Sequence, residues 1–356
     1  MNARIAAALL VLLAALGGGA LLVRQQAESQ KSPEAGVLGQ PLLKGLQASQ
    51  VAAIAIREPK GAITIARKGE QWTIAERDGF PADYDKVRDF VLKAIALKIG
   101  QSEPIGDKDR ARLLLDAGGT AIEFLGADGK PLARLTAGKK YFKTEPENPD
   151  KALGDGRYVA LPGDEKRVYV ISDPLAQAST KTADWISKTG FEVEKVKTLE
   201  LHAADGDGWK IERSGDNADW KLAGIRGGEK LEITKANAAG YTFGRLEIAD
   251  VAPKEAKPED TGLAKPTAVT ATTFDGLTYA LSLGKLAGDN YYATLRISGD
   301  PKPEGKDAEE RLKKINERLP REKALGGYTL LIPKSRLEDI VRKRAELLAK
   351  KEEKKK

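Results

Sequence analysis

The 356-residue sequence contains no cysteine and only one histidine, His202. Without cysteine the chain can form no disulfide, no thiolate metal site and no cysteine nucleophile, and it has no N-terminal cysteine to carry a lipid. One histidine excludes a metal site built from several histidines, and a serine–histidine–aspartate triad could use only His202. Because His202 alternates with Glu200 along a strand-like stretch, we expect both side chains on the polar face of a strand. His202 is therefore predicted to be an ordinary surface histidine.

Aromatic residues are also scarce, at 6% of the sequence, so we expect a core built mainly from Val, Ile, Leu and Ala. The net charge of +7 is uneven, because residues 343–356 contain seven Lys or Arg and three Asp or Glu. A nucleic-acid-binding protein has a basic face with interleaved aromatic residues, and the sequence shows none. No nucleic acid partner is therefore expected. The charged C-terminal end is predicted to be solvated.

One long stretch without charge is present, residues 5–23, and it follows a positively charged start that contains Arg4. A helix of this length spans roughly the 30 Å hydrocarbon layer of a bilayer. We predict that residues 1–24 are a transmembrane anchor with Arg4 in the cytoplasm, or a secretory signal cleaved near the small residues 18–20. The anchor is favoured because apolar residues 21–23 follow the small ones. Either segment implies that the body of the protein is exported.

The remaining apolar pattern predicts an α+β fold with mainly antiparallel sheets, built as two tandem repeats of one unit. Each unit is a β-meander followed by a helix, a β-hairpin and further strands. The predicted parts are a linker at 25–45, a first repeat at 46–178, a short helical connector at 179–195, a second repeat at 196–335, and a C-terminal helix with a charged tail at 336–356.

In the first repeat, Asp83 is placed to cap a helix. The apolar stripe of this helix contains Val87, Phe90, Val91, Ala94 and Ile95, so we expect it to pack on the meander. A short helical turn is predicted at 110–116. Runs of β-type composition predict strands at 51–56, 62–66, 71–75, 121–125, 132–136, 157–161 and 167–171.

The second repeat follows the same order, with a helix capped by Thr234 that carries Ala239, Phe243 and Leu246 on one stripe. A charged, helical insertion is predicted near 300–326. The predicted strands are 196–201, 209–213, 219–223, 279–285, 291–295 and 328–332. The landmarks that recur in order are Trp72 and Trp220, Gly138 and Gly284, and Tyr158 and Tyr292. Their common order indicates an internal duplication with loops of unequal length.

Residues that would demand a particular chemistry are largely missing. No stretch has the spacing of a phosphate-binding loop or a dinucleotide-binding fingerprint, and we interpret Gly138 and Gly284 as turns. Two carboxylate pairs occur, one at a helix start, where capping explains it, and one in a charged loop; they are Asp83 with Asp85 and Asp107 with Asp109. We predict no catalytic, cofactor-binding or metal-binding residues and no enzyme activity. A hydrolase that uses His202 or a carboxylate pair is a remote alternative.

Several stretches together resemble a known family: Trp72 with Ile74, and residues 80–87, 133–138, 156–163 and 167–170. With the N-terminal apolar run, they are similar to the domain-of-unknown-function 4340 family over most of residues 45–340. Family members usually have Tyr-Gly-Leu ahead of a proline. The second repeat has Gly262, Leu263 and Pro266, whereas residues 114–117 of the first repeat depart from this pattern.

The resemblance implies a single-pass protein of the bacterial inner membrane whose body lies on the periplasmic or extracytoplasmic side. It also implies an auxiliary, non-ATPase component of an ABC-type transport system, with permease and ATPase subunits as partners and the bilayer contacted through residues 5–23. No catalytic residues are established for the family, so none is transferred, and no cofactor is expected.

Two functional hypotheses of different kinds follow. The first is a membrane-anchored accessory or scaffold protein of a transporter complex. The alternative is an envelope module that binds glycan or another polymer without catalysis. A polymer-binding module requires exposed aromatic side chains, and the sequence candidates are Tyr141, Phe142, Tyr291 and Tyr292.

Overall fold

The computed structural model describes residues 36–188, 190–244 and 246–349. The predicted anchor at 5–23 and residues 350–356 of the charged tail lie outside this range. Among the residues described, no helix is both long and apolar enough to cross a bilayer. The chain forms two compact units. Unit 1 contains Met1–Ala62 and Arg88–Thr180, and unit 2 contains Ile63–Val87 and Lys181–Lys356.

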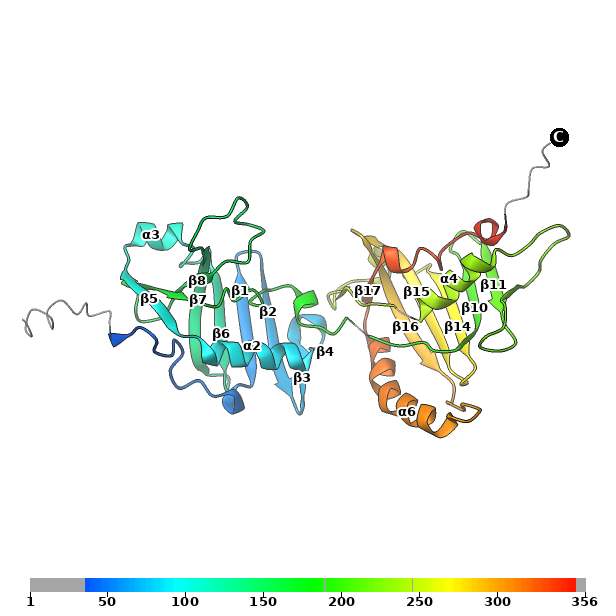
Figure 1. Cartoon of the computed structure of the whole chain (residues 1–356), viewed down its shortest axis with the longest axis horizontal. Coiled ribbons are helices and arrows are strands. Elements are labelled where there is room, and N and C mark those ends of the chain that lie inside the picture. Colours follow the sequence, from blue (N-terminus) through cyan, green and yellow to red (C-terminus); the bar gives the residue numbers. More distant parts are fainter. Residues whose placement is uncertain (1–35, 189, 245, 350–356) are drawn as a thin grey trace, which may run out of the picture. The chain divides into compact units, whose positions relative to one another are not determined.

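The first sheet has nine strands in the order β4-β3-β2-β1-β6-β7-β8-β9-β5 (Figure 1). Helices α2 (Tyr84–Ala96) and α3 (Asp107–Arg112) flank β5 in the sequence. The strands are β1 (Ala53–Glu58), β2 (Gly61–Lys68), β3 (Gln71–Ile74), β4 (Phe80–Pro81), β5 (Ile99–Pro104), β6 (Thr120–Leu125), β7 (Pro131–Tyr141), β8 (Gly156–Ala160) and β9 (Arg167–Ile171). The pairing is antiparallel, as in β6 with β7 and β8 with β9.

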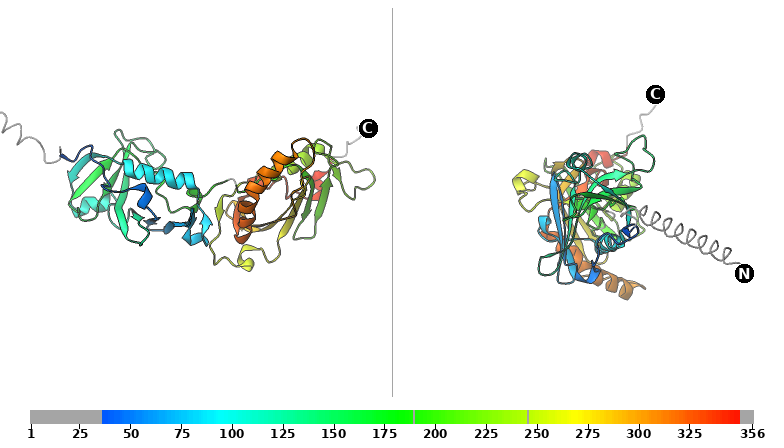
Figure 2. Two further views of the ribbon diagram at one scale, coloured as in Figure 1. Left: turned by 90° about the horizontal axis from the view of Figure 1, so that it is seen from below. Right: turned by 90° about the vertical axis from the view of Figure 1, so that its left-hand side faces the viewer.

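The second sheet has eight strands in the order β12-β11-β10-β14-β15-β16-β17-β13. Its helices are α4 (Ile233–Phe243), α5 (Pro258–Thr261) and α6 (Ala308–Ala324), and α6 contacts β16 (Figure 2). The strands are β10 (Val196–His202), β11 (Gly208–Glu212), β12 (Lys221–Leu222), β13 (Asp250–Val251), β14 (Thr267–Thr273), β15 (Thr278–Ala287), β16 (Asn290–Ser298) and β17 (Leu330–Pro333). The prediction of an α+β fold with mainly antiparallel sheets is confirmed.

Alternation along the strands gives the second sheet one buried and one open face. In β10, Leu199 and Leu201 are buried, whereas the side chain of His202 is exposed. On the open face, the hydroxyl oxygens of Thr198 and Thr272 are 2.6 Å apart across β10 and β14. This is the arrangement expected of an antiparallel sheet with one solvated face.

The predicted first helix is confirmed as α2. The Asp83 carboxylate accepts hydrogen bonds from the amides of Asp85 at 3.0 Å and Lys86 at 3.3 Å, which caps the helix as expected. The ring of Phe90 stacks on Phe124 of β6 at a centroid distance of 5.9 Å. Of the five residues of the predicted stripe, Ile95 is half-buried and the other four are buried: Val87, Phe90, Val91 and Ala94.

Gly138 and Gly284 were predicted to lie in turns, and this is wrong. Gly138 lies within β7 and Gly284 within β15. A Cβ atom on Gly138 would lie 2.2 Å from the carbonyl oxygen of Leu113, and one on Gly284 would lie 2.1 Å from that of Thr261. In both sheets, glycine is required because a preceding segment of backbone crosses the strand closely.

The second helix differs from its prediction at the N-terminus. Helix α4 begins at Ile233, so Thr234 lies inside it, and the cap residue Glu232 makes no side-chain hydrogen bond. The predicted stripe is nevertheless buried: Ala239, Phe243 and Leu246. Thr234 was predicted to be the cap because threonine is a good N-cap residue. The helix instead begins at Ile233, after residues 231–232, which pair with the C-terminal segment through Leu231 with Leu348 and Glu232 with Leu347.

Three further elements differ from prediction. The connector is mostly irregular, with one 3-10 turn at Thr182–Asp184 in place of a helix. The C-terminal helix is replaced by 3-10 turns at Lys334–Arg336 and Arg344–Leu347. Asp107 and Asp109 lie in the first turn of α3, not in a loop. The predicted insertion near 300–326 is confirmed as helical and extends over the 17 residues of α6.

Candidate functional site

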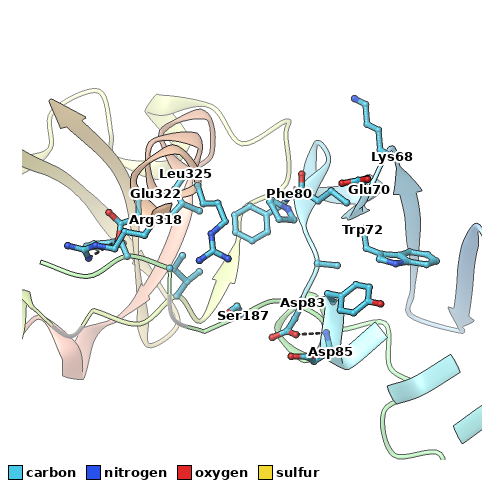
Figure 3. A pocket seen from close by; sticks show the side chains of 18 of the residues that line it. Lys68, Glu70, Trp72, Phe80, Asp83, Asp85, Ser187, Arg318, Glu322 and Leu325 are labelled. Atoms are coloured by element: carbon cyan, nitrogen blue, oxygen red, sulfur yellow. Dashed lines mark hydrogen bonds and ion pairs between the residues drawn. The ribbon is translucent and has the colours of Figure 1, made fainter. Parts of the chain in front are cut away.

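A pocket of about 840 Å³ lies in unit 2 (Figure 3). One wall is formed by β3, β4 and the start of α2, and it includes Trp72 and Asp85. Figure 3 shows Arg318 and Glu322 of α6 on the opposite side. All of the lining residues belong to unit 2. We refer to this pocket as the unit 2 groove.

The strand wall of the unit 2 groove carries two aromatic side chains at its surface. Trp72 is half-buried, and Tyr84, the first residue of α2, is 60% exposed. Phe80, on the same wall, is buried and meets the ring of Tyr328 edge-on at a centroid distance of 4.9 Å. The Tyr328 hydroxyl donates to the carbonyl of Gly79 at 3.3 Å. The wall therefore combines a packed base with accessible rings.

The backbone N–H groups of this wall already form hydrogen bonds within the chain or are absent. Pro81 has no N–H, the amide of Ala82 donates to the Trp72 carbonyl at 2.8 Å, and the amide of Asp83 donates to the Trp185 carbonyl at 2.7 Å. The wall consequently offers side chains, with few backbone donors, to anything that enters the groove.

The helix wall contains residues spaced to share one face of α6 and the following turn: Arg318, Arg321, Glu322 and Leu325. Leu325 is buried, whereas Arg321 is exposed. Arg318 is held by several acceptors, including the Glu192 carbonyl and the Glu322 carboxylate at 3.1 Å. Arg321 forms no ion pair within the described part of the chain.

Glu322 is the buried carboxylate of this site, with its side chain 5% exposed. One carboxylate oxygen accepts from the Glu192 amide at 2.9 Å and from Arg318 at 3.1 Å, and the other lies 3.4 Å from the Tyr279 hydroxyl. Burial raises the pKa of Glu322, and the hydrogen bond from the Glu192 amide and the charge of Arg318 oppose this rise. Burial and the neighbouring Glu322 also raise the pKa of Tyr279.

A second pocket of about 820 Å³ lies beside α4 in the same unit. Its floor contains Trp220, which is buried beneath the Arg213 guanidinium at 4.8 Å from the ring centroid. Arg213 also donates through all three guanidinium nitrogens, to the Val196 carbonyl at 2.6 Å, to the Asp216 carbonyl and to the Asp216 carboxylate at 2.8 Å. Because these partners use most of the donors of Arg213, we assign it a structural role.

The structure places His202 where the sequence predicted it. Its side chain is 68% exposed and its Nε2 lies 2.8 Å from the carboxylate of Glu200, on the open face of the second sheet. In the part of the chain that the structure describes, the hydrogen-bond partner of Nε2 is the carboxylate of Glu200 and not a serine. The site does not resemble a nucleophile–base pair.

The carboxylate pairs also have structural partners. Asp83 caps α2, and Asp85 lies beside it on the rim of the unit 2 groove. Asp109 forms an exposed ion pair with Arg112 at 3.1 Å within α3. In residues 36–188, 190–244 and 246–349, no group of three or more His, Asp or Glu is positioned to hold a metal ion.

The aromatic residues proposed from the sequence for polymer binding are not the exposed ones. Tyr141 meets Tyr158 edge-on at 5.6 Å and is half-buried, and the remaining candidates are half-buried as well: Phe142, Tyr291 and Tyr292. The exposed tyrosines are Tyr84 and Tyr241, at 60% and 62%. Strand alternation could not reveal this, because both lie on helices.

Sequence reasoning also missed Glu322 and Arg321, which were hidden among the many charges of the insertion. A usable signal was present: Glu322 continues the spacing of the buried residues Ile315 and Leu319 toward Leu325. A carboxylate on the apolar stripe of an amphipathic helix indicates a buried polar contact.

The model of a family described as "Domain of unknown function (DUF4340)" matches residues 72–266. No curated protein and no solved structure matches the chain significantly.

Proposed function

The chain belongs to the DUF4340 family, and on this premise we propose that it is a membrane-anchored, extracytoplasmic accessory protein that serves as a non-ATPase component of an ABC-type transport system. The observation that carries the proposal is the uncharged run at 5–23, placed behind Arg4 and ahead of an α+β body of this family. In this proposal the run spans the inner membrane of a bacterium once, and the body is exported.

The ends of both sheets suggest how partners bind. Three of the four end strands, β4, β12 and β13, are two residues long. The fourth, β5, has an irregular register next to Ile99 and ends at Pro104. Short, irregular or proline-containing edges disfavour the addition of a strand from another chain. We therefore expect permease subunits to contact helices, sheet faces or loops of the exported body, and the ATPase subunits to join the complex through the permease.

The strand orders support the proposal that the two halves are copies of one unit. If β1 to β3 correspond to β10 to β12 and β6 to β9 correspond to β14 to β17, all eight strands of the second sheet follow the order of the first, with β5 matching β13 and β4 left without a counterpart. Gly138 and Gly284 then occupy equivalent positions, and each is crossed by the segment that contains α3 or α5. A duplicated unit offers two related surfaces to a transporter built from paired subunits.

We further propose that the role is not catalytic. The single histidine is on an open sheet face with Glu200, and the carboxylates at 83 and 109 are engaged in capping and in an ion pair. These contacts account for the residues that a hydrolase would use.

The proposal is tested by purification of the tagged full-length protein from its native membrane in a mild detergent, followed by mass spectrometry. We expect permease and ATPase subunits to be recovered. A tagged, unrelated single-pass protein of the same membrane is the control. Recovery of the protein alone, or of the same proteins as the control, would overturn the accessory role.

A further inference from the structure

The unit 2 groove has a combination of side chains that the accessory role does not explain. Its strand wall presents the rings of Trp72 and Tyr84 at the surface. Side chains with planar, hydrogen-bonding ends line the same groove, namely Glu70, Gln71 and Asp85 on the strand wall and Arg321 on the helix wall. Aromatic rings supply flat apolar area at a small entropic cost, and planar polar groups fix orientation.

This combination suits a sugar ring better than a strictly apolar ligand. A pyranose has an apolar C–H face that packs on an aromatic ring, and its rim of hydroxyls pairs with carboxylate, amide and guanidinium groups that offer two atoms at once. The groove volume of about 840 Å³ lies in the range of small-ligand sites.

A peptide is the obvious competitor, and the backbone of the strand wall argues against it. An extended peptide gains affinity by joining the edge of a sheet. Here the edge strand β4 has Pro81, and the amides of Ala82 and Asp83 already donate within the chain. Recognition at this wall therefore depends on side chains, which is the usual situation for a glycan.

The charged side chains of the two walls favour a neutral glycan over an acidic one. The strand wall carries Glu70, Asp83 and Asp85 against one lysine, Lys68. On the helix wall, the charge of Arg318 is shared with Glu322, at 3.1 Å, and with Glu192, at 3.7 Å. An acidic polysaccharide would be repelled by the strand wall, so a neutral chain is favoured.

We propose that the unit 2 groove binds a neutral pyranose glycan, with Tyr84 and Trp72 stacking on its sugar faces and Asp85 and Arg321 binding its hydroxyls. The inference goes beyond the accessory role and stands without it. It assigns the side chains of Trp72, Tyr84, Asp85 and Arg321 to ligand contact and leaves Glu322 as the residue that positions α6.

The test is isothermal titration calorimetry of the full-length protein, in a detergent without a sugar headgroup, with cellotetraose and chitotetraose as neutral probes. A tetramer of galacturonate is the acidic probe and an unstructured peptide of mixed composition is the peptide probe. Tyr84→Ala is the test variant. Tyr241→Ala is its matched control, because Tyr241 is equally exposed and lies outside this groove.

We expect at least one neutral probe to bind and Tyr84→Ala to weaken it roughly tenfold, as the loss of one stacked ring implies. Arg321→Ala should weaken it as well, whereas Tyr241→Ala and Lys323→Ala, on the exposed surface of α6, should bind as the parent does. Thermal unfolding of each variant shows that it is folded.

Three results would overturn the proposal: no heat with either neutral probe at millimolar concentration, tighter binding of the acidic or peptide probe, or equal loss in Tyr84→Ala and Tyr241→Ala. None of these results bears on the subunits recovered in the membrane purification. The two experiments therefore test glycan binding in the groove and the accessory role independently.

Discussion

Gly240 lies against the indole ring of Trp220 so closely that a Cβ atom on residue 240 would come within 2.7 Å of Cζ2. Glycine inside a helix costs about 1 kcal/mol relative to alanine. Here the close approach offsets that cost, because it buries Trp220 between α4 and the guanidinium of Arg213.

The first prediction concerns Gly240→Ala. Helix propensity alone would stabilise α4, but the added methyl group must displace a buried ring, so we expect the free energy of unfolding to fall by about 1 to 2 kcal/mol. Urea unfolding followed by tryptophan fluorescence measures this change. Asn237→Ala on the exposed side of α4 is the control and should raise stability by about 0.5 kcal/mol. A Gly240→Ala protein as stable as this control would show that Trp220 moves freely.

The second prediction concerns the two strand glycines. In Gly138→Ala and Gly284→Ala the new methyl group would lie 2.2 and 2.1 Å from a backbone carbonyl oxygen. A backbone carbonyl, unlike the end of a flexible side chain, cannot move aside by a change of rotamer. We expect each variant to lose more than about 2 kcal/mol of stability. Gly227→Ala, where a Cβ atom would meet nothing within 4 Å, is the control and should change stability by less than about 0.5 kcal/mol. If both strand variants melt like the control, the close crossings described for β7 and β15 are incorrect.

The third prediction concerns Glu322 and pH. Burial raises the pKa of Glu322 above its ordinary value of 4.5, so the folded protein holds this proton more tightly than the unfolded chain. The resulting contribution to stability is complete below pH 4.5 and is lost as pH rises through the folded pKa. Glu322→Gln removes this titration, so the parent should lose stability relative to the variant as pH rises from about 4.5 toward neutrality.

Denaturant unfolding at a series of pH values measures the difference between these proteins. Glu310→Gln on the same helix is the control, because its ion pair with Lys314 lowers the pKa of Glu310 and must give the opposite trend. A stability difference between the parent and Glu322→Gln that is independent of pH would exclude a raised pKa at Glu322.

The fourth prediction concerns the C-terminal segment. The guanidinium of Arg344 binds both carboxylate oxygens of Glu229, at 3.1 and 2.8 Å. This contact, together with a hydrogen bond from the Arg226 amide, lowers the pKa of Glu229 to about 2. The pair therefore stabilises the fold above pH 4.5, and this contribution is lost as pH falls toward about 2.

In Arg344→Gln we expect the pKa of Glu229 to rise toward 4.5 and to stay somewhat below it, because the Arg226 amide remains at 2.8 Å. Carboxyl-carbon NMR titration of glutamate-labelled protein measures the value. Arg336→Gln breaks a different surface pair, with Glu247, and should leave Glu229 unchanged. An unaltered Glu229 in Arg344→Gln would assign its low pKa to the backbone amide alone.

The elements that the sequence predicted well are those whose signal is local. A continuous run of β-branched and aromatic residues predicted β9 (Arg167–Ile171) at its observed bounds, and Asp83 with the stripe through Phe90 predicted α2. Three of the four edge strands, β4, β5 and β13, were not predicted because they are very short or lack an alternating pattern, whereas β12 lies within the strand predicted at 219–223. β5 has no alternating pattern and becomes a strand because it pairs with β9, with Ile99 opposite Ile171.

The candidate site divides in the same way. Trp72 and residues 80–85 were singled out as sequence motifs, and they form one wall of the unit 2 groove. The other wall comes from α6, more than 230 residues further along the chain, and only folding brings Arg318 and Glu322 opposite those motifs. The burial of Glu322 depends on residues far away in the sequence, so the composition of the insertion did not predict it.

By itself, the sequence determined the α+β class, the strand-rich order of both halves, the surface position of His202 and the family, because each depends on residue type or on spacing within a few residues. Only the tertiary structure decided that Gly138 and Gly284 lie under crossing backbone, that Glu322 is buried, and that Tyr84 and Tyr241 are the exposed tyrosines. Those properties depend on which distant segments pack together, since burial and close approach are created by the fold and not by the chain alone.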